Sequence, residues 1–391
     1  MNVTLSTDSP ASLPLLTAPA VPKVSEVVVK ELCAVLFPLL SRRGRRLRAE
    51  QYLRGLLSAT GRKSIRNIAA QVGGPGIEQS LHHFITSSAW PWRPLRAALA
   101  GYMENTVAPV AWVVRPLDIP KAGSHSVGVD EHFAPHLGQV YRGQQAQGVW
   151  LTSPELSAPV NWRMVVPEPW ITDSGRRKQA DVPGDLRPES REECAVSAVL
   201  QMVQGWDMPA RPVLLDMRQG PVLAATSRLS TAGVSFLARV SPSCRLLVAD
   251  PASPGHRAGA LAAQRVANMV TGRRTPVPWH DVVRGTPRTT TATTVPVVLP
   301  GGARPRQLSL LAEWADPAGP CSGLWLTNMT SASLFSLLRL SKLEDRTETD
   351  FARIGSRAGL RDFAGRSFCG WHRHMTLASI AHTATALSTN G

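Results

Sequence analysis

The sequence predicts an α/β protein that begins with a helical domain and carries a β-rich segment in its second half. Three observations predict this class. Apolar residues recur at helical spacing between residues 24 and 85, short apolar runs at residues 111–114 and 213–215 have the composition of buried strands, and residues 243–335 are rich in Pro, Thr and Gly with short β-prone runs. A chain of 391 residues is long enough for two or three domains.

The charge of the chain favours a polyanionic partner. The formal net charge is +15 and the isoelectric point is near 10.7, while the hydrophobic content of 43% is ordinary for a globular protein. Nucleic acid is the commonest polyanion that suits such a balance. Only six of the 43 basic residues are lysines, so codon bias explains the preference for arginine but not the excess of positive charge.

Several classes of protein are excluded by what the sequence lacks. The five cysteines are scattered without a Cys-x-x-Cys pair, which argues against a disulfide framework or a zinc module and fits a reducing cytoplasm. No run approaches the roughly 18 apolar residues of a membrane span, and the N-terminus lacks a secretion signal. Residues 1–22 are rich in Ser, Thr, Pro and Ala and are predicted to be a disordered tail. We therefore expect a cytoplasmic protein with no membrane partner.

Residues 23–105 are predicted to form an all-helical domain, with helices near residues 24–40, 52–57, 62–72 and 77–85. This stretch holds 13 basic and 5 acidic side chains, so 13 − 5 = +8 of the net charge of +15 lies here, which is more than half. A charge run usually marks only a solvated surface, but an excess concentrated in one helical module favours contacts to DNA phosphates. The candidate DNA-binding residues here are Arg42, Arg43, Arg45, Arg46, Arg48, Arg62, Lys63 and Arg66.

Residues 106–242 are predicted to be the first part of an α/β core. The strand at residues 111–114 is expected to stop at Arg115-Pro116, because proline cannot continue a central ladder. The clearest strand is Val213-Leu214-Leu215-Asp216, which is apolar and ends in a carboxylate. Further strands are predicted at residues 126–129, 147–151, 160–166, 234–238 and 293–299, and a helix at residues 192–205.

Several spaced motifs resemble the DDE transposases of the insertion-sequence-701 type, which belong to the wider insertion-sequence-4 group. Gly220 follows Asp216 at the spacing of the family's Asp-x-x-x-Gly motif, and counting back from Gly359 places Glu348 at the family's catalytic glutamate. The resemblance covers most of residues 30–385 and is weakest in the β-rich segment. Other matching positions are Pro120, Lys121, Gly123, Ser126, Val127, Gly128, Val129, Leu360, Arg366, Ser367, Gly370, Trp371, Arg373, His374, Thr376, Leu377 and Ala378.

The resemblance implies a ribonuclease-H-like α/β core behind an N-terminal all-helical DNA-binding domain. Residues 243–335 would be a β-rich insertion between the second and third catalytic carboxylates, and residues 336–391 the C-terminal helices of the core. It also implies double-stranded DNA as partner and two divalent metal ions, with Asp216 and Glu348 as catalytic residues and metal ligands. Lys121 and Arg373 join the candidate DNA-binding residues on the same ground.

The position of the family's first catalytic aspartate holds no carboxylate. It is occupied by Pro116, or by Arg115 if the register slips by one residue. Arginine brings positive charge where metal ions would lie, and proline brings no ligand. Asp118 is the nearest carboxylate, but at strand rise it lies about 6.6 Å further along and would need a bulge to replace the missing ligand. We expect Arg115 to pair with Asp216 instead of a metal.

The helix around Glu348 differs from the family signature as well. The family's Tyr, Arg and Lys positions hold Ser341, Glu344 and Gly355 here. Together with the missing aspartate, these differences are hard to reconcile with a working nuclease.

Three interpretations of function are open at this stage. The first, which we prefer because of the missing ligand, is a domesticated and catalytically inactive transposase that still binds DNA, for example as a transcriptional regulator. The second is an active transposase that cuts and joins DNA, with Asp118, Asp216 and Glu348 binding Mg²⁺. The third is the product of a decaying gene whose fold persists. Mg²⁺ is needed only in the second case, and the sequence leaves a homodimer open.

Overall fold

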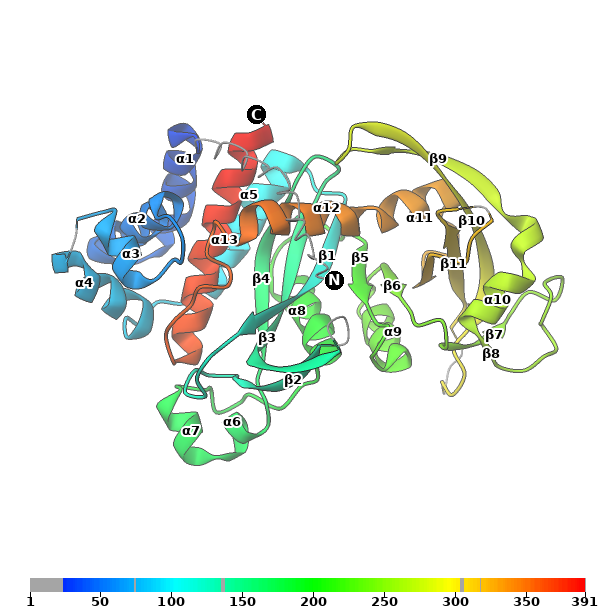
Figure 1. Ribbon diagram of the computed structural model, residues 1–391, viewed down its shortest axis with the longest axis horizontal. Helices are drawn as coiled ribbons and strands as arrows, with labels where there is room; N and C mark the ends of the chain where they lie inside the picture. The colour runs from blue at the N-terminus through cyan, green and yellow to red at the C-terminus, as the bar shows by residue number, and fades with distance from the viewer. Residues whose placement is uncertain (1–23, 74, 135–137, 303–305, 317, 391) are drawn as a thin grey trace, which may run out of the picture.

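The computed structural model describes residues 24–390, except residues 74, 135–137, 303–305 and 317 (Figure 1). The predicted tail, residues 1–22, lies outside the described residues. Along the described chain, helices come first and a large mixed sheet follows. The chain then returns through a long C-terminal helix to the N-terminal helices (Figure 1).

Helices fill most of the region between residues 26 and 107, as the periodicity predicted. In α2 the buried residues Ala49, Tyr52, Leu53 and Leu56 follow helical spacing, which gives this arginine-rich helix one apolar face. The helix begins earlier than predicted and includes most of the basic run. The elements are α1 (Glu26–Leu36), the 3-10 turn η1 (Phe37–Leu39), α2 (Arg43–Ser58), α3 (Ile65–Ala70), α4 (Pro75–Thr86) and α5 (Arg93–Val107).

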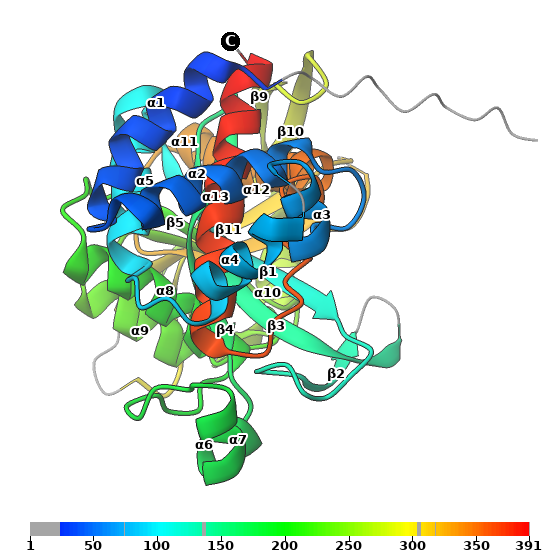
Figure 2. The ribbon, with the colours of Figure 1, turned by 90° about the vertical axis from the view of Figure 1, so that its left-hand side faces the viewer.

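The C-terminal helix α13 (Phe368–Asn390) lies between the N-terminal helices and the sheet (Figures 1 and 2). Nearly every residue from 370 to 386 is buried, because helices pack on one side of α13 and strand β4 packs on the other. The predicted boundary between residues 105 and 106 falls inside α5, which contacts both α13 and the sheet. The helices and the core therefore share one continuous apolar interior.

Within the described residues, twelve strands join one mixed sheet in the order β2-β3-β1-β5-β6-β12-β11-β10-β7-β8, with β4 beside β3 and β9 beside β10. Strands β4, β3 and β1 are antiparallel to one another, whereas β5 and β6 run parallel to β1. This order is consistent with a ribonuclease-H-like core. The core strands are β1 (Ala111–Pro120), β2 (Asp130–Ala134), β3 (Gln139–Thr152), β4 (Ser157–Val165), β5 (Val213–Asp216) and β6 (Phe236–Arg239).

The β-rich segment extends the core sheet because β12 pairs directly with β6. Its elements are β7 (Arg245–Val248), β8 (Leu261–Ala262), α10 (Ala263–Met269), η2 (Thr271–Arg273), β9 (Thr275–Asp281), β10 (Thr286–Val298), β11 (Leu308–Trp314) and β12 (Gly323–Thr327). The remaining helices are α6 (Pro169–Thr172), α7 (Ser174–Gln179), α8 (Arg191–Gly205), α9 (Val222–Thr231), α11 (Leu334–Ser341), α12 (Leu343–Asp350) and the π-helical turn η3 (Phe351–Gly355).

Two predicted strand positions were wrong. Strand β1 does not stop at Arg115-Pro116 but continues to Pro120 along β3. On its other side β1 pairs with β5 only at residues 112–113, so Pro116 has no hydrogen bond to lose on that side. Residues 126–129 form a turn instead of a strand. Gly128 has a left-handed φ of 74°, and the N–H of Val127 donates to the carbonyl of Arg366.

Among the helices of the described residues, none combines the length and apolar character needed to span a bilayer.

Candidate functional site

Three charged residues lie in a row across neighbouring strands: Arg115 in the middle of β1, Asp216 at the carboxyl end of β5 and Arg239 at the carboxyl end of β6. Strands β1 and β5 are parallel with Val113 opposite Leu214, and two residues further along each strand lie Arg115 and Asp216. Asp216 is itself opposite Arg239 on β6. Because side chains alternate between the faces of a strand, these three share one face of the sheet. The row therefore alternates positive, negative and positive charge.

Helix α12 places two more carboxylates over this row, one helical turn apart. Glu348 accepts two hydrogen bonds from Arg115, at 2.8 Å from Nε and 3.0 Å from Nη2. Glu344 accepts one from Nη1 of Arg239 at 2.8 Å. The guanidinium carbon of Arg115 also lies 3.5 Å from the ring centroid of Phe351, so the same cation is held by a carboxylate and an aromatic face.

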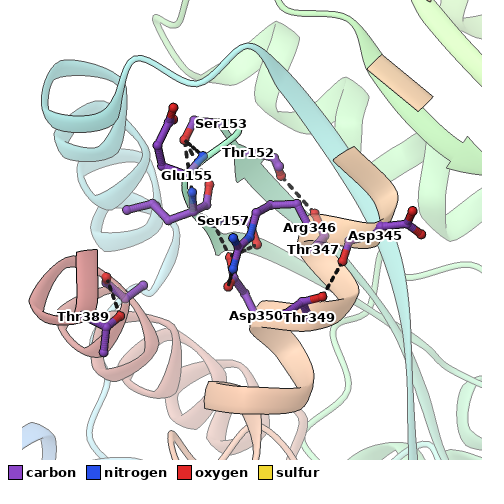
Figure 3. A network of polar contacts seen from close by, with 12 residues as sticks. Thr152, Ser153, Glu155, Ser157, Asp345, Arg346, Thr347, Thr349, Asp350 and Thr389 are labelled. Carbon is purple, nitrogen blue, oxygen red and sulfur yellow. Dashed lines mark hydrogen bonds and ion pairs between the residues drawn. The ribbon is translucent and has the colours of Figure 1, made fainter. Parts of the chain in front are cut away.

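Buried polar contacts fix the orientation of α12 (Figure 3). The carboxylate of Asp350, 2% exposed, accepts from the backbone N–H of Ser157 at 2.7 Å and from its hydroxyl at 3.0 Å, and it pairs with Arg346 on its own helix. The hydroxyls of Thr347 and Thr152 are 3.1 Å apart. This side of α12 is thus bound to the β3–β4 hairpin.

Asp216 has its own arginine partner. Arg218, two residues further along the chain, donates from its backbone N–H at 3.0 Å and from Nη2 at 2.6 Å. Burial opposes ionisation, but these hydrogen bonds outweigh it and hold the pKa of Asp216 below its ordinary value. The predicted pairing of Arg115 with Asp216 was wrong, because α12 brings Glu348 to Arg115 while Arg218 binds both oxygens of Asp216.

Asp118 lies apart from the other two carboxylates. Strand β1 pairs with β3 without a register shift from Ala111 to Pro120, so the bulge that would move Asp118 is not formed there. Strand alternation then places Asp118 on the face opposite Arg115. It accepts from the hydroxyl of Tyr141 at 2.8 Å and from Arg191 at the start of α8 at 3.4 Å.

The carboxylates in this arrangement do not fit a pair of divalent ions. Such a centre needs several carboxylate oxygens converging on the metals, whereas Asp118, Asp216 and Glu348 are each paired with a different arginine. In the part of the chain that the structure describes, no group of three His, Cys, Asp or Glu residues is placed to hold a metal ion. Arg115, Asp216 and Arg239 form three ion pairs instead, with Glu348, Arg218 and Glu344, and this network is neutral overall.

The candidate DNA-binding residues fall into three groups. Arg42, Arg45 and Arg48 line a groove of about 710 Å³ between the start of α2 and the end of α4, which also contains His83 and Ser87. Four further candidates of the helical region are exposed, namely Arg43, Arg46, Arg62 and Arg66.

Three other candidates are used within the fold. Lys63 is 5% exposed and its ammonium group donates to the carbonyl of Ala59, while Lys121 donates to the carbonyl of Phe363. Arg373 is 6% exposed and donates to the carbonyl of Ile85 at 3.0 Å. These cations face backbone oxygens, so the DNA surface proposed below does not include them.

Sequence reasoning missed two arginines of the site, Arg218 and Arg239. Arg239 ends a buried strand just as Asp216 does, and that shared position was the available signal. Arg218 gave no comparable signal, because its role depends on the turn that follows β5.

The fold defines the class of this protein as mixed α/β, with a mixed sheet that is consistent with a ribonuclease-H-like core. Residues 35–298 match the sequence model of the family described as DDE superfamily endonuclease, which is more than half of the chain. The chain therefore belongs to the DDE endonuclease superfamily, whose members act on DNA. The match includes Asp216 and ends before Glu348. No curated protein matches the chain in a sequence comparison.

Proposed function

We propose that this member of the DDE superfamily binds double-stranded DNA without cutting it. It would be a domesticated, catalytically inactive transposase of the insertion-sequence-701 type that acts through DNA binding, for example as a regulator of transcription. The observation that supports this most directly is the pair of hydrogen bonds between Arg115 and Glu348. A cytoplasmic location, a homodimer and the domain boundaries given above stay predictions.

The reasoning starts from what strand cleavage would require. Two divalent ions must share carboxylate ligands at the ends of neighbouring strands. Arg115 instead occupies both oxygens of Glu348, while both oxygens of Asp216 are bound by Arg218. The chain thus has Arg115-Pro116 where the family's first aspartate would supply a ligand, and Arg115 neutralises a second candidate ligand, Glu348. Asp118 cannot replace the ligand from the opposite face of β1.

The groove between α2 and α4 is the proposed DNA surface. Arg42, Arg45 and Arg48 recur every three residues along the start of α2, which brings their side chains to one side of the helix. Within the described residues these three arginines form no ion pair, so their charge is available to phosphates. The hydroxyl of Ser87 and the ring of His83 add further hydrogen-bonding groups along the groove.

The DNA-binding part of the proposal is tested by the salt dependence of binding. Fluorescence anisotropy with a labelled duplex should give an affinity that falls steeply as salt rises. Replacing Arg42, Arg45 and Arg48 together by Gln should reduce the slope of log K against log salt by about 0.9 for each lost phosphate contact. The matched control replaces three exposed, unpaired arginines of the β-rich segment, Arg245, Arg257 and Arg265. An equal effect of both triple variants would assign binding to net charge alone.

The inactive site is tested by incubation of bound DNA with Mg²⁺ or Mn²⁺. The wild-type protein should leave supercoiled and linear duplexes intact, and Asp216→Asn should retain DNA binding within about twofold, because Asp216 is engaged by Arg218. Metal-dependent nicking by the wild type that disappears in Asp216→Asn would contradict the proposal and restore an active transposase.

A further inference from the structure

A second cavity lies away from the charged row, between the start of α5, strand β4 and the start of α13. It encloses about 690 Å³, and Arg96, Trp162 and His372 in its wall are each at most 5% exposed. It shares no lining residue with the Arg42–Arg45–Arg48 groove. A cavity of this size is in the range that holds a small organic ligand.

The wall of this cavity carries an excess of positive charge. Arg96 is buried, and its five N–H groups donate only to neutral acceptors: the hydroxyl of Thr376, the side chain of Asn161, the carbonyl of Trp162 and two atoms of His372. Among the described residues, no carboxylate pairs with this buried cation.

Two more arginines, Arg93 and Arg187, lie exposed at the rim and form no ion pair within the described residues. Asp185 is the one unpaired acid that lines the cavity, because Glu189 is bound to Arg163. The start of α5 adds to the positive charge around the cavity. Its first turn contains Arg93 but no acidic residue, although the N-terminal end of a helix normally favours negative charge.

Aromatic rings supply a flat surface next to these cations. The indole of Trp92 lies parallel to the ring of His372, with centroids 4.9 Å apart and an interplanar angle of 5°. Phe368 packs edge-on against His372, at 4.4 Å and 66°. Trp92 is half-buried and lines the cavity, so one stack of rings faces the same space as the unpaired arginines.

We infer that this cavity binds a single unpaired nucleotide, with the base against Trp92 and the phosphate at Arg93 and Arg187. A planar base matches the aromatic surface, since base–aromatic stacking tolerates any base. A phosphate compensates the charge that Arg96 leaves buried and that the rim arginines leave unpaired. The nucleotide comes either from solution or from an unpaired position in a DNA strand. This inference does not rest on the proposed function.

Isothermal titration calorimetry of the full chain with deoxyadenosine 5′-monophosphate tests the inference. The nucleotide should bind at least about tenfold more tightly than deoxyadenosine or inorganic phosphate alone, because each of these lacks one half of the contacts. Trp92→Leu and Arg187→Gln should each weaken binding about fivefold or more. Arg187 is exposed and unpaired, so its replacement does not endanger folding, and Arg245→Gln, which removes an equally exposed charge elsewhere, should leave binding unchanged.

The source of the nucleotide is distinguished by competition. A duplex with one unpaired adenine should displace the mononucleotide better than a fully paired duplex if DNA supplies it, and equally well if the free nucleotide is the ligand. The inference is overturned if no binding occurs up to about 1 mM, if phosphate alone binds as well as the nucleotide, or if Trp92→Leu and Arg187→Gln both bind like the wild type. Duplex binding through the Arg42–Arg45–Arg48 groove would persist in all three cases.

Discussion

The charged row at the strand ends and the buried network around α13 use similar residues for different purposes. In the row, the carboxylate of Glu348, which pairs with Arg115, is 62% exposed, and the ion pairs Arg218–Asp216 and Arg239–Glu344 are also partly exposed. Around α13, by contrast, Arg96, His372 and His374 are at most 5% exposed and reach helices and strands far away in sequence. Exposed ion pairs contribute little to stability, whereas a buried charge is costly unless every donor is satisfied.

The buried network holds the N-terminal helices onto the core. Nδ1 of His374 lies 2.8 Å from the hydroxyl oxygen of Tyr52 on α2, and Nε2 of the same ring lies 2.8 Å from the carbonyl oxygen of Gly359. Arg373 donates to the carbonyls of Ile85 and Trp90 at the end of α4 and beyond it. Two positions of the C-terminal stretch that match the transposase family, Arg373 and His374, are therefore engaged in packing.

This difference explains how the two regions can change independently. Replacing a residue of the charged row alters a few solvated contacts, while replacing one of the buried network leaves several donors or acceptors without partners. A chain can thus keep its fold and its helical DNA surface while the strand ends lose the ligands for catalysis.

The comparison predicts its largest effect at Arg96. Changing Arg96→Leu removes a buried donor from the carbonyl of Trp162 and leaves Nδ1 of His372 unsatisfied, and it should lower the free energy of unfolding by about 1–3 kcal/mol. Urea unfolding followed by circular dichroism measures this. The neighbouring Arg93→Leu, at an exposed position, should stay within about 0.5 kcal/mol of the wild type. Equal losses for both variants would contradict a special role of the buried network.

A second effect concerns the pH dependence of stability. Burial lowers the pKa of His374 and that of His382 to about 4 each, from the ordinary 6.5. Both histidines are therefore neutral in the folded protein at pH 5 but protonated in the unfolded chain. Their contribution to stability is present above pH 6.5 and is lost as the pH falls toward 4, by up to about 1.4 kcal/mol per pH unit for each histidine.

Thermal unfolding measured between pH 6.5 and 5 tests this slope. His382→Met removes one of the titrating groups and should flatten the slope by up to about 1.4 kcal/mol per pH unit. Exposed His82→Met serves as the control and should leave the slope unchanged. A slope that is the same in His382→Met and in the wild type would mean that His382 does not contribute to the acid sensitivity.

The sequence was most informative where apolar patterns decide the structure. Strand β5 and helix α8 were predicted almost to the residue because a short apolar run and a helical period leave few alternatives. The turn at Gly128 and the full length of β1 were missed, because they depend on contacts with Arg366 and β3 that lie far along the chain.

For the site, the sequence indicated that Arg115 excludes a metal ligand but not which carboxylate it binds. That choice depends on the angle at which α12 crosses the sheet, and the angle is set by the contacts of Asp350 with Ser157. The burial of Lys63 and Arg373 could not be predicted from the sequence either, because a basic side chain in a basic run gives no local sign that it packs inward.

The smallest effect is expected at the ion pair of the charged row itself. Removing either partner should cost little stability, because the carboxylate of Glu348 is mostly solvated. Arg115→Met should cost about 1 kcal/mol, since it also gives up the contact with the ring of Phe351, and Glu348→Gln should cost less. A double-mutant cycle from urea unfolding should give a coupling below about 1 kcal/mol that shrinks as salt is added. A coupling above about 2 kcal/mol that is insensitive to salt would place Arg115 with the buried network. The contrast between the two regions would then fail, and the arginine would have to be explained as a requirement of the fold.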